Sequence, residues 1–484
     1  MTLTMDWGLL LPALLPVAAL ALILVVEAIA PTARPVLVVL AGFGLVAAAA
    51  ETIPGLVGDD DPRLTLCTPA PDGRCMWDGG ALTSTLQLAI LLSTLAVLAL
   101  ISVRRAGVIE LVMLLASASG GVAVVAARDL GTWLITLELA TLPVIALVAW
   151  RDRRAAAHGA LTLLTTSLVS FGLLVLGTAL WVTATGDPTL TGESLATAWA
   201  VPEQRTLAGL ATVVLLAGLA FKLSAVPFHA WTPTTLTSGP LPISALLASS
   251  SKLAAIGALI VVLAPYDAVV DLSPGPHVVV AALVILTVAS MLTGTVMALR
   301  QTEVVRLLAW STVAQAGWIL LPLTALTVAG RQAAAVYTLV YAVAGLVAFA
   351  AVRAIHGRRV EDGRELTAYT GLFRRDPLTG GALALALLVL AGLPPGVIGL
   401  VAKIVALRPA VSAGLWPVAV VAVVAAVLGI AVYVRWFAVL FGEPTIDAPA
   451  RPAQRRASLG VALIGSAVLV VASALPQLLV GLVS

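Results

Sequence analysis

Residues 206–264 read TLAGLATVVLLAGLAFKLSAVPFHAWTPTTLTSGPLPISALLASSSKLAAIGALIVVLA. The segment holds two apolar runs, 206–230 and 241–264, and each run contains one lysine, Lys222 or Lys252. An apolar run of about 20 residues can cross a hydrocarbon core of about 30 Å as a helix. The segment therefore predicts two transmembrane helices with a charged side chain in each, the first interrupted at Pro227.

The same apolar character continues through all 484 residues. Hydrophobic residues make up 61% of the chain and charged residues 11%, and the mean hydropathy is +1.09. Soluble domains carry about 25% charged residues, and a β-barrel would show short alternating segments instead of continuous apolar runs. We predict an all-α polytopic membrane protein of about 14 transmembrane helices. The spans are expected near 7–29, 34–52, 81–103, 107–127, 130–150, 156–183, 206–230, 241–264, 276–299, 305–328, 332–352, 379–407, 414–438 and 458–482.

The loop arginines predict how these spans are oriented. Eighteen arginines fall on one side: Arg34, Arg104, Arg105, Arg151, Arg153, Arg154, Arg300, Arg306, Arg353, Arg358, Arg359, Arg364, Arg374, Arg375, Arg435, Arg451, Arg455 and Arg456. Six fall on the other: Arg63, Arg74, Arg128, Arg205, Arg331 and Arg408. Cytoplasmic loops carry the excess of basic residues. The first side is therefore expected to be cytoplasmic, with both termini outside a bacterial inner membrane.

Two cysteines lie in a loop that this orientation places outside. Cys67 and Cys75 flank a Pro/Gly-rich turn, CTPAPDGRC. An oxidising compartment permits a disulfide between them; the alternative is two unpaired thiols.

Several classes of cofactor site have no motif in the chain. There is no Gly-rich dinucleotide fingerprint, no CxxC cluster and no Walker loop. We expect the chain to hold no redox cofactor and to hydrolyse no nucleotide unaided. Its energy would then come from an ion gradient or from partner subunits.

Four charged side chains lie in the middle of predicted spans: Glu138, Lys222, Lys252 and Lys403. Each costs about 2.5–3.5 kcal/mol at the bilayer centre, and such residues usually belong to an ion pathway. The alternatives are structural salt bridges and snorkelling side chains. The three lysines are the only ones in the chain. Arginine stays protonated in proteins whereas a buried lysine can titrate, so this choice favours groups that release a proton.

Two of these spans are interrupted by proline. The seventh breaks at Ser224, Pro227 and His229, after Lys222, and the twelfth breaks at Pro394 and Pro395, before Lys403. Broken helices survive at membrane depth only where they line a cavity or are covered by protein. The two breaks lie five spans apart, which predicts an inverted repeat; two incidental proline kinks are the alternative. The expected segments are 1–103 (three helices and an outside loop), 107–264 (first five-helix repeat), 276–438 (second repeat) and 458–484 (last helix).

Two further ionisable residues have open interpretations. His229 could relay protons between Lys222 and the cytoplasmic side, or it could cap the carbonyls freed by the break. Glu110 could belong to the path by which protons enter, or it could pair with Arg104 or Arg105.

Five motifs resemble the antiporter-like membrane subunits of respiratory complex I. AFKLSAVPFHAWTP and SALLASSSKLAAIGAL resemble their seventh and eighth spans, and LELATLP resembles their fifth-span glutamate motif. RLLAWSTVAQAGWIL is similar to their tenth span and AGLPPGVIGLVAKI to their broken twelfth span. Lys252 and Lys403, and the absence of a long lateral helix, favour the subunit N branch of NADH-quinone oxidoreductase.

The resemblance implies a proton-translocating subunit of an NADH:quinone oxidoreductase. Its channel would run from Glu138 and Lys222 through Lys252 to Lys403, driven by quinone reduction elsewhere in the complex. No cofactor is expected in this chain, and FMN, Fe–S clusters and quinone are expected on partner subunits. The implied partners are the other complex I membrane subunits and lipids, with no nucleic acid.

The chain departs from the family pattern at three places. Gln315 stands where the family usually has a histidine, Thr234 where an acidic residue often stands, and TSGPLPIS replaces the usual EGAPTPV. Glutamine carries no proton as an ion, so Gln315 would act through water or weaken the path. Two alternatives stay open: a subunit of a multi-subunit Na⁺/H⁺ antiporter or membrane-bound hydrogenase, and a structural membrane subunit that no longer pumps.

Overall fold

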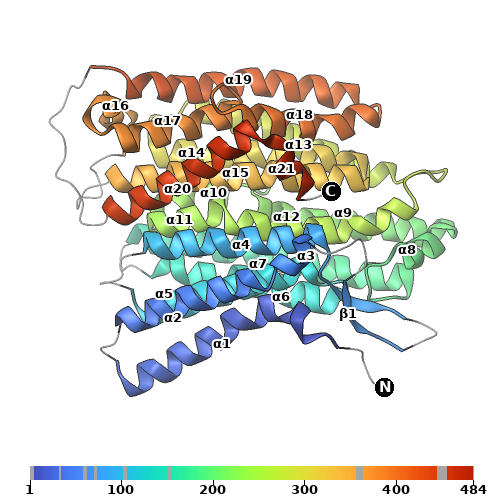
Figure 1. The fold of residues 1–484 in the computed structure, drawn as a ribbon. Coiled ribbons are helices and arrows are strands. Elements are labelled where there is room, and N and C mark those ends of the chain that lie inside the picture. The colour runs from blue at the N-terminus through green and yellow to red at the C-terminus, as the bar shows by residue number, and fades with distance from the viewer. Residues whose placement is uncertain are drawn as a thin grey trace.

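The computed structural model describes residues 5–31, 34–57, 63–69, 73–101, 106–150, 154–355, 364–443 and 455–482. It is a bundle of long helices that lie side by side, with the loops gathered at two opposite ends (Figure 1). Within the described ranges, 13 helices are long and apolar enough to cross a membrane. The all-α prediction is confirmed.

The long helices follow the predicted spans closely. They are α1 (Trp7–Ile29), α2 (Arg34–Ala50) with α3 (Ile53–Val57), α4 (Ala81–Leu100), α5 (Val108–Ala126), α6 (Leu130–Ala149), α7 (Arg154–Thr185), α9 (Pro202–Leu223), α11 (Leu241–Ala248) with α12 (Ser250–Leu263), α13 (His277–Leu299), α14 (Val304–Leu320), α15 (Val328–Ile355), α19 (Trp416–Leu440) and α20 (Arg455–Ala474). Two shorter helices, α17 (Pro377–Ala391) and α18 (Val397–Ser412), together supply the twelfth span, so the count of about 14 holds.

The breaks expected in the seventh and twelfth spans are present. α9 ends at Leu223, and α10 (Trp231–Ser238) resumes the seventh span after the segment that contains Pro227. α17 ends at Ala391, and α18 begins after Pro394 and Pro395. Proline lacks the backbone N–H of a helix interior and its ring clashes with the preceding turn, so neither helix continues through these positions.

Three spans that were expected to be continuous are not. The eighth is divided at Ser249, whose hydroxyl donates to the Ala245 carbonyl (2.6 Å), a bond that bends helices. The tenth leaves α-helical geometry after Leu320, two residues before Pro322, and continues as the 3₁₀ turn η2 (Leu321–Ala325). The last one ends at Ala474 and resumes as α21 (Pro476–Gly481).

One end of the bundle carries a small hairpin and both described chain ends. Strands β1 (Leu64–Cys67) and β2 (Cys75–Asp78) pair antiparallel, and a Cys67–Cys75 disulfide joins them (S–S 1.95 Å). The Asp6 N–H donates to the Thr65 hydroxyl (2.7 Å), and the Thr85 hydroxyl donates to the Leu482 carbonyl (2.6 Å). The first and last described residues therefore lie at the hairpin end of the bundle, the end at which α8 (Gly192–Trp199) also lies (Figure 1).

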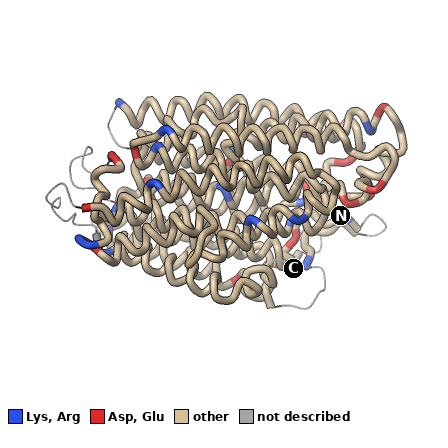
Figure 2. The backbone as a smooth tube through the Cα atoms, turned by 90° about the horizontal axis from the view of Figure 1, so that it is seen from above, with Lys and Arg blue, Asp and Glu red and all other residues tan. Residues whose placement is uncertain are grey.

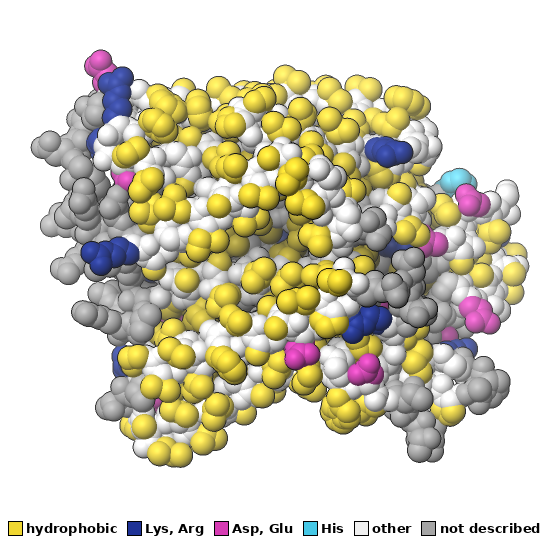
Figure 3. Space-filling model, viewed as in Figure 1, with side chains coloured by type: hydrophobic (Ala, Val, Ile, Leu, Met, Phe, Trp, Pro, Cys, Tyr) yellow, Lys and Arg dark blue, Asp and Glu magenta, His cyan; other side chains and the backbone are white. Residues whose placement is uncertain are grey.

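Charged residues gather at the two ends and leave the middle of the bundle apolar. Figure 2 shows most basic and acidic residues near the ends of the helices, and Figure 3 shows a broad hydrophobic surface between them. Arg34 and Arg154 open α2 and α7, and Arg353 lies in the last turn of α15. Apolar sides with charged ends are the surface that a bilayer requires.

Candidate functional site

Glu138 and Lys222 form a buried ion pair in the first half of the bundle. α6 carries Glu138, and Lys222 is the penultimate residue of α9. The Lys222 Nζ donates to Glu138 Oε1 (2.9 Å), to the Thr141 hydroxyl (2.9 Å) and to the Ser167 hydroxyl on α7 (3.1 Å). An ammonium group has three donors. All three are therefore occupied inside the apolar bundle.

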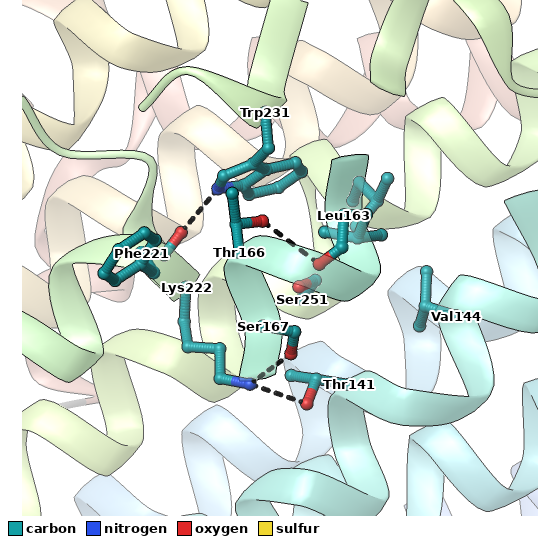
Figure 4. A pocket seen from close by; sticks show the side chains of 10 residues that line it. Thr141, Val144, Leu163, Thr166, Ser167, Phe221, Lys222, Trp231 and Ser251 are labelled. Atoms are coloured by element: carbon teal, nitrogen blue, oxygen red, sulfur yellow. Dashed lines mark hydrogen bonds between the residues drawn. The ribbon is translucent and has the colours of Figure 1, made fainter. Parts of the chain in front are cut away.

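A cavity of about 30 Å³ adjoins this ion pair. Figure 4 shows Lys222 reaching toward Thr141 and Ser167 at its wall, while Trp231 donates to the Phe221 carbonyl (2.8 Å). Ser251, which precedes Lys252, also lines it. A cavity of this size has room for water, and it lies beside Lys222.

Lys252 lies at the broken end of α9. Its Nζ donates to the Lys222 carbonyl (2.9 Å) and to the Ser224 hydroxyl (2.6 Å), and lies 5.2 Å from the Trp231 ring centre. The C-terminal end of a helix carries a partial negative charge on its free carbonyls. Lys252 therefore neutralises that end of α9, and its contact with the Lys222 backbone links it to the ion pair.

Lys403 has the same kind of environment at the other broken helix. Its Nζ donates to the carbonyls of Leu390 (3.0 Å) and Ala391 (2.7 Å), the last two residues of α17. It lies 5.6 Å from the centre of the Trp318 ring. Among the described residues, neither Lys403 nor Lys252 has a carboxylate within 4 Å.

Gln315 lies in a cluster of hydroxyl groups close to Lys403. Its Nε2 donates to the Tyr433 hydroxyl (2.9 Å), and its Oε1 accepts a hydrogen bond from Tyr337. The Tyr433 and Ser311 hydroxyls are 2.6 Å apart. A second cavity, of about 10 Å³, is lined by Gln315, Ser311, Tyr433 and Lys403. The structure thus groups Lys403 with Gln315, separately from Glu138, Lys222 and Lys252.

The tyrosines of this cluster were missed by the sequence interpretation. Tyr337, Tyr341 and Tyr433 are all buried, and Tyr341 donates to the Thr312 hydroxyl (2.9 Å). The chain has only five tyrosines. Tyrosines in the middle of apolar spans could have indicated a buried polar cluster, because a buried tyrosine hydroxyl usually needs a hydrogen-bond partner.

His229 and Glu110 lie apart from these contacts. His229 packs against Trp310 of α14, with ring centres 5.3 Å apart, and its Nδ1 has no hydrogen-bond partner among the described residues. Glu110 is buried in the first turn of α5. Arg104 and Arg105, its expected partners, lie outside the described residues. Within those ranges, no three His, Cys, Asp or Glu residues are grouped to hold a metal ion.

Known proteins with similar sequences include subunits of NADH-quinone oxidoreductase. The family model for "NADH:quinone oxidoreductase/Mrp antiporter, TM" matches residues 127–429. NADH-quinone oxidoreductase subunit N of Salinispora tropica is 39% identical over 465 residues, which cover 92% of this chain and 87% of that protein.

Two solved structures have closely similar folds. A chain of respiratory complex I from Thermus thermophilus is 28% identical, with a TM-score of 0.79 over 97% of this chain and 98% of that one. A chain of the Mrp complex from Dietzia has a TM-score of 0.84 over 99% and 96% at 22% identity, a likeness of fold alone.

Proposed function

Because the chain belongs to the subunit N branch of the NADH:quinone oxidoreductase/Mrp antiporter family, we propose that it is a proton-translocating subunit of an NADH:quinone oxidoreductase. The complex is an enzyme and a translocase, and this chain contributes the proton path without redox chemistry of its own. FMN, Fe–S clusters and quinone belong to partner subunits, and the other membrane subunits of the complex are its neighbours.

The observation that carries the proposal is the Glu138–Lys222 ion pair next to Lys252. A Glu⁻/Lys⁺ pair about 4 Å apart attracts by about 4 kcal/mol at an effective dielectric of 20, and separation to about 8 Å halves that attraction. Moving one charge against about 150 mV costs about 3.5 kcal/mol. Opening one pair is too weak to move a proton across the membrane, so a series of coupled sites is required.

The remaining groups supply that series. Lys222 exchanges protons with Lys252 at the break of α9, where Lys252 Nζ binds the Lys222 carbonyl. Lys403 exchanges protons with the Gln315 cluster through the second cavity. His229 and Glu110 are candidates for the path that connects the row to one surface. Helix α15, which carries Tyr337 and Tyr341, contacts both α12 and α14 and is one of the elements that join the two groups.

The two groups correspond to two inverted repeats, 107–264 and 276–438. Equivalent close contacts support this division. A Cβ on Gly120 would lie 2.3 Å from the Ala140 nitrogen, and one on Gly294 would lie 2.2 Å from the Ala314 nitrogen. Each contact joins the first two helices of its repeat, and each repeat later contains a helix broken at a left-handed residue.

Substitution of the lysines tests the proposal. Lys222→Met and Lys403→Met, each in the intact complex in membrane vesicles, should abolish most proton pumping per electron while NADH:quinone reduction in the presence of an uncoupler continues. Glu203→Gln, in the first turn of α9 at the surface, serves as a charge-removal control. Unchanged pumping in both lysine variants would favour a structural subunit.

A Na⁺/H⁺ antiporter subunit is the second candidate, because the Mrp complex of Dietzia contains a chain of the same fold. The proteins that co-purify with this chain separate the candidates. NADH-binding, flavin and Fe–S subunits support the oxidoreductase, whereas small cation-antiporter subunits support the alternative.

A further inference from the structure

The residue that follows each broken helix differs between the two halves. α9 is followed by Ser224 with φ 66°, and α17 is followed by Gly392 with φ 80°. This left-handed conformation is unfavourable for residues with a Cβ and easy for glycine. Gly392 is therefore the residue that the backbone favours, whereas Ser224 is disfavoured by it. A non-glycine residue held in this region often marks a functional constraint.

The Ser224 side chain is fully buried and contacts the proton path. Its Oγ accepts a hydrogen bond from Lys252 Nζ at 2.6 Å, and the other hydrogen-bond partner of Lys252 is the Lys222 carbonyl. A carbonyl only accepts hydrogen bonds, whereas a hydroxyl both accepts and donates. The hydroxyl can therefore accept from the lysine ammonium and, after the proton leaves, donate to the lone pair of the neutral amine.

We propose that Ser224 is a positioning residue that holds Lys252 at the end of α9 in both of its protonation states. Lys252 then exchanges its proton without leaving the helix break. The inference rests on the proposed function, since it assigns Ser224 a part in the same proton path. It explains why a residue with a Cβ stands at a position where the backbone favours glycine.

The second break has no equivalent hydroxyl. A Cβ on Gly392 would lie 3.4 Å from Lys403 Nζ, so a side chain there would meet the lysine directly. Lys403 is bonded to two carbonyls and faces the cavity lined by Gln315 and Tyr433. When Lys403 is neutral, its amine faces the Tyr433 hydroxyl and the Gln315 amide across that cavity. Lys252, enclosed at the first break, depends on Ser224 instead.

Ser224→Gly in the intact complex is the decisive variant, because it keeps the backbone conformation and removes the hydroxymethyl side chain. Relief of the left-handed backbone strain, about 1–2 kcal/mol, offsets much of the lost hydrogen bond to the Lys252 ammonium, so thermal stability and assembly should change little. Pumping per electron should fall several-fold. The hydrogen bond between the Ser224 hydroxyl and Lys252 is stronger when the lysine is charged than when it is neutral. Its loss should therefore shift the protonation equilibrium of Lys252 roughly fivefold toward the neutral amine. Half-maximal pumping on the alkaline side should therefore move about 0.7 pH units toward acidic pH.

Two further variants separate positioning from structure. Asparagine also tolerates the left-handed conformation and carries both donors and an acceptor, so Ser224→Asn should restore part of the pumping and of the pH profile. Ser290→Ala removes a hydroxyl that accepts from Val226 N–H in the same break (2.9 Å) but contacts no lysine. It should lower stability and leave the pH profile in place.

Wild-type pumping and a wild-type pH profile in Ser224→Gly would overturn the proposal, as would an equal pH shift in Ser290→Ala. Lys252→Met shows whether the role of Ser224 or the proposed proton path itself is wrong. If Lys252→Met stops pumping while Ser224→Gly is normal, only the role of Ser224 is wrong. If both pump normally, the proposed proton path through this break is wrong.

Discussion

At the scale of single residues, the three buried ammonium groups are compensated in two ways. Lys222 faces the Glu138 carboxylate, whereas Lys252 and Lys403 bind carbonyl oxygens at the ends of broken helices and lie over indole rings. A helix C-terminus carries about half a negative charge, and a desolvated cation–π contact contributes about 2 kcal/mol. These terms offset the cost of about 2.5–3.5 kcal/mol for each lysine.

Tyr433→Phe tests the hydroxyl cluster. The change removes the partner of Gln315 Nε2 and of the Ser311 hydroxyl and leaves two buried polar groups unsatisfied. It should destabilise the protein by about 1–3 kcal/mol. If the cluster carries protons, pumping should fall as well. Thermal unfolding and vesicle pumping assays measure the two effects separately.

Tyr369→Phe is the matched control for Tyr433→Phe. The Tyr369 hydroxyl is buried without a hydrogen-bond partner among the described residues, so its removal should leave stability unchanged or raise it. Both variants keep the aromatic ring, so an equal loss of stability in Tyr369→Phe would contradict the assignment of the Tyr433→Phe loss to its hydrogen bonds.

At the scale of helices, close backbone contacts between pairs of neighbours organise each half. Gly294 of α13 lies against the backbone of Ala314 in α14, and Gly120 of α5 lies against Ala140 in α6. Lipid offers little hydrophobic driving force for helix association, so close packing at small residues contributes much of it. α6 and α14 carry Glu138 and Gln315, and these contacts therefore also set the depth of the site residues.

Gly294→Ala should separate α13 from α14, because the new Cβ would lie 2.2 Å from a backbone nitrogen. Overpacking of this kind costs about 1–3 kcal/mol. The same substitution at Gly172 in α7 meets no atom within 4 Å and should stabilise the helix by about 0.5–1 kcal/mol. Thermal unfolding of both variants checks the opposite signs, and a stable Gly294→Ala protein would contradict the close contact.

At the scale of the whole molecule, the two ends of the bundle differ in character. One end has the disulfide-linked hairpin and both described chain termini. The other end has most of the described arginines. The basic bias of cytoplasmic loops predicts that the hairpin end lies outside.

Thiol labelling tests this orientation. Cys75→Ser frees the Cys67 thiol at the hairpin end, and a membrane-impermeant maleimide should label it in intact spheroplasts. Arg374→Cys, in a Cys67→Ser/Cys75→Ser background, places a thiol on an exposed residue of α16 (Leu372–Arg375) at the opposite end. That thiol should react only after permeabilisation. The reverse pattern would invert the orientation.

Local chemistry alone was enough to predict most of the spans and the two proline breaks. The length of an apolar run and the missing N–H of proline act within a few residues, so neighbours in the sequence determine their effect. The breaks after Leu223 and Ala391 follow from this. The sequence did not predict the division of the eighth span at Ser249. A serine hydroxyl can donate to a carbonyl of the preceding helical turn, as Ser249 does, but not every serine in a helix forms this bond or interrupts the helix.

Only the tertiary structure decided which groups face one another. Glu138 and Lys222 lie 84 residues apart, Gln315 and Tyr433 lie 118 apart, and Lys252 binds a carbonyl of another helix. In a soluble helix the apolar face identifies the buried side. A membrane helix is apolar toward lipid and toward its neighbours alike, so its sequence does not reveal which face packs inward. Helix packing supplied that choice and, with it, the partners of each buried charge.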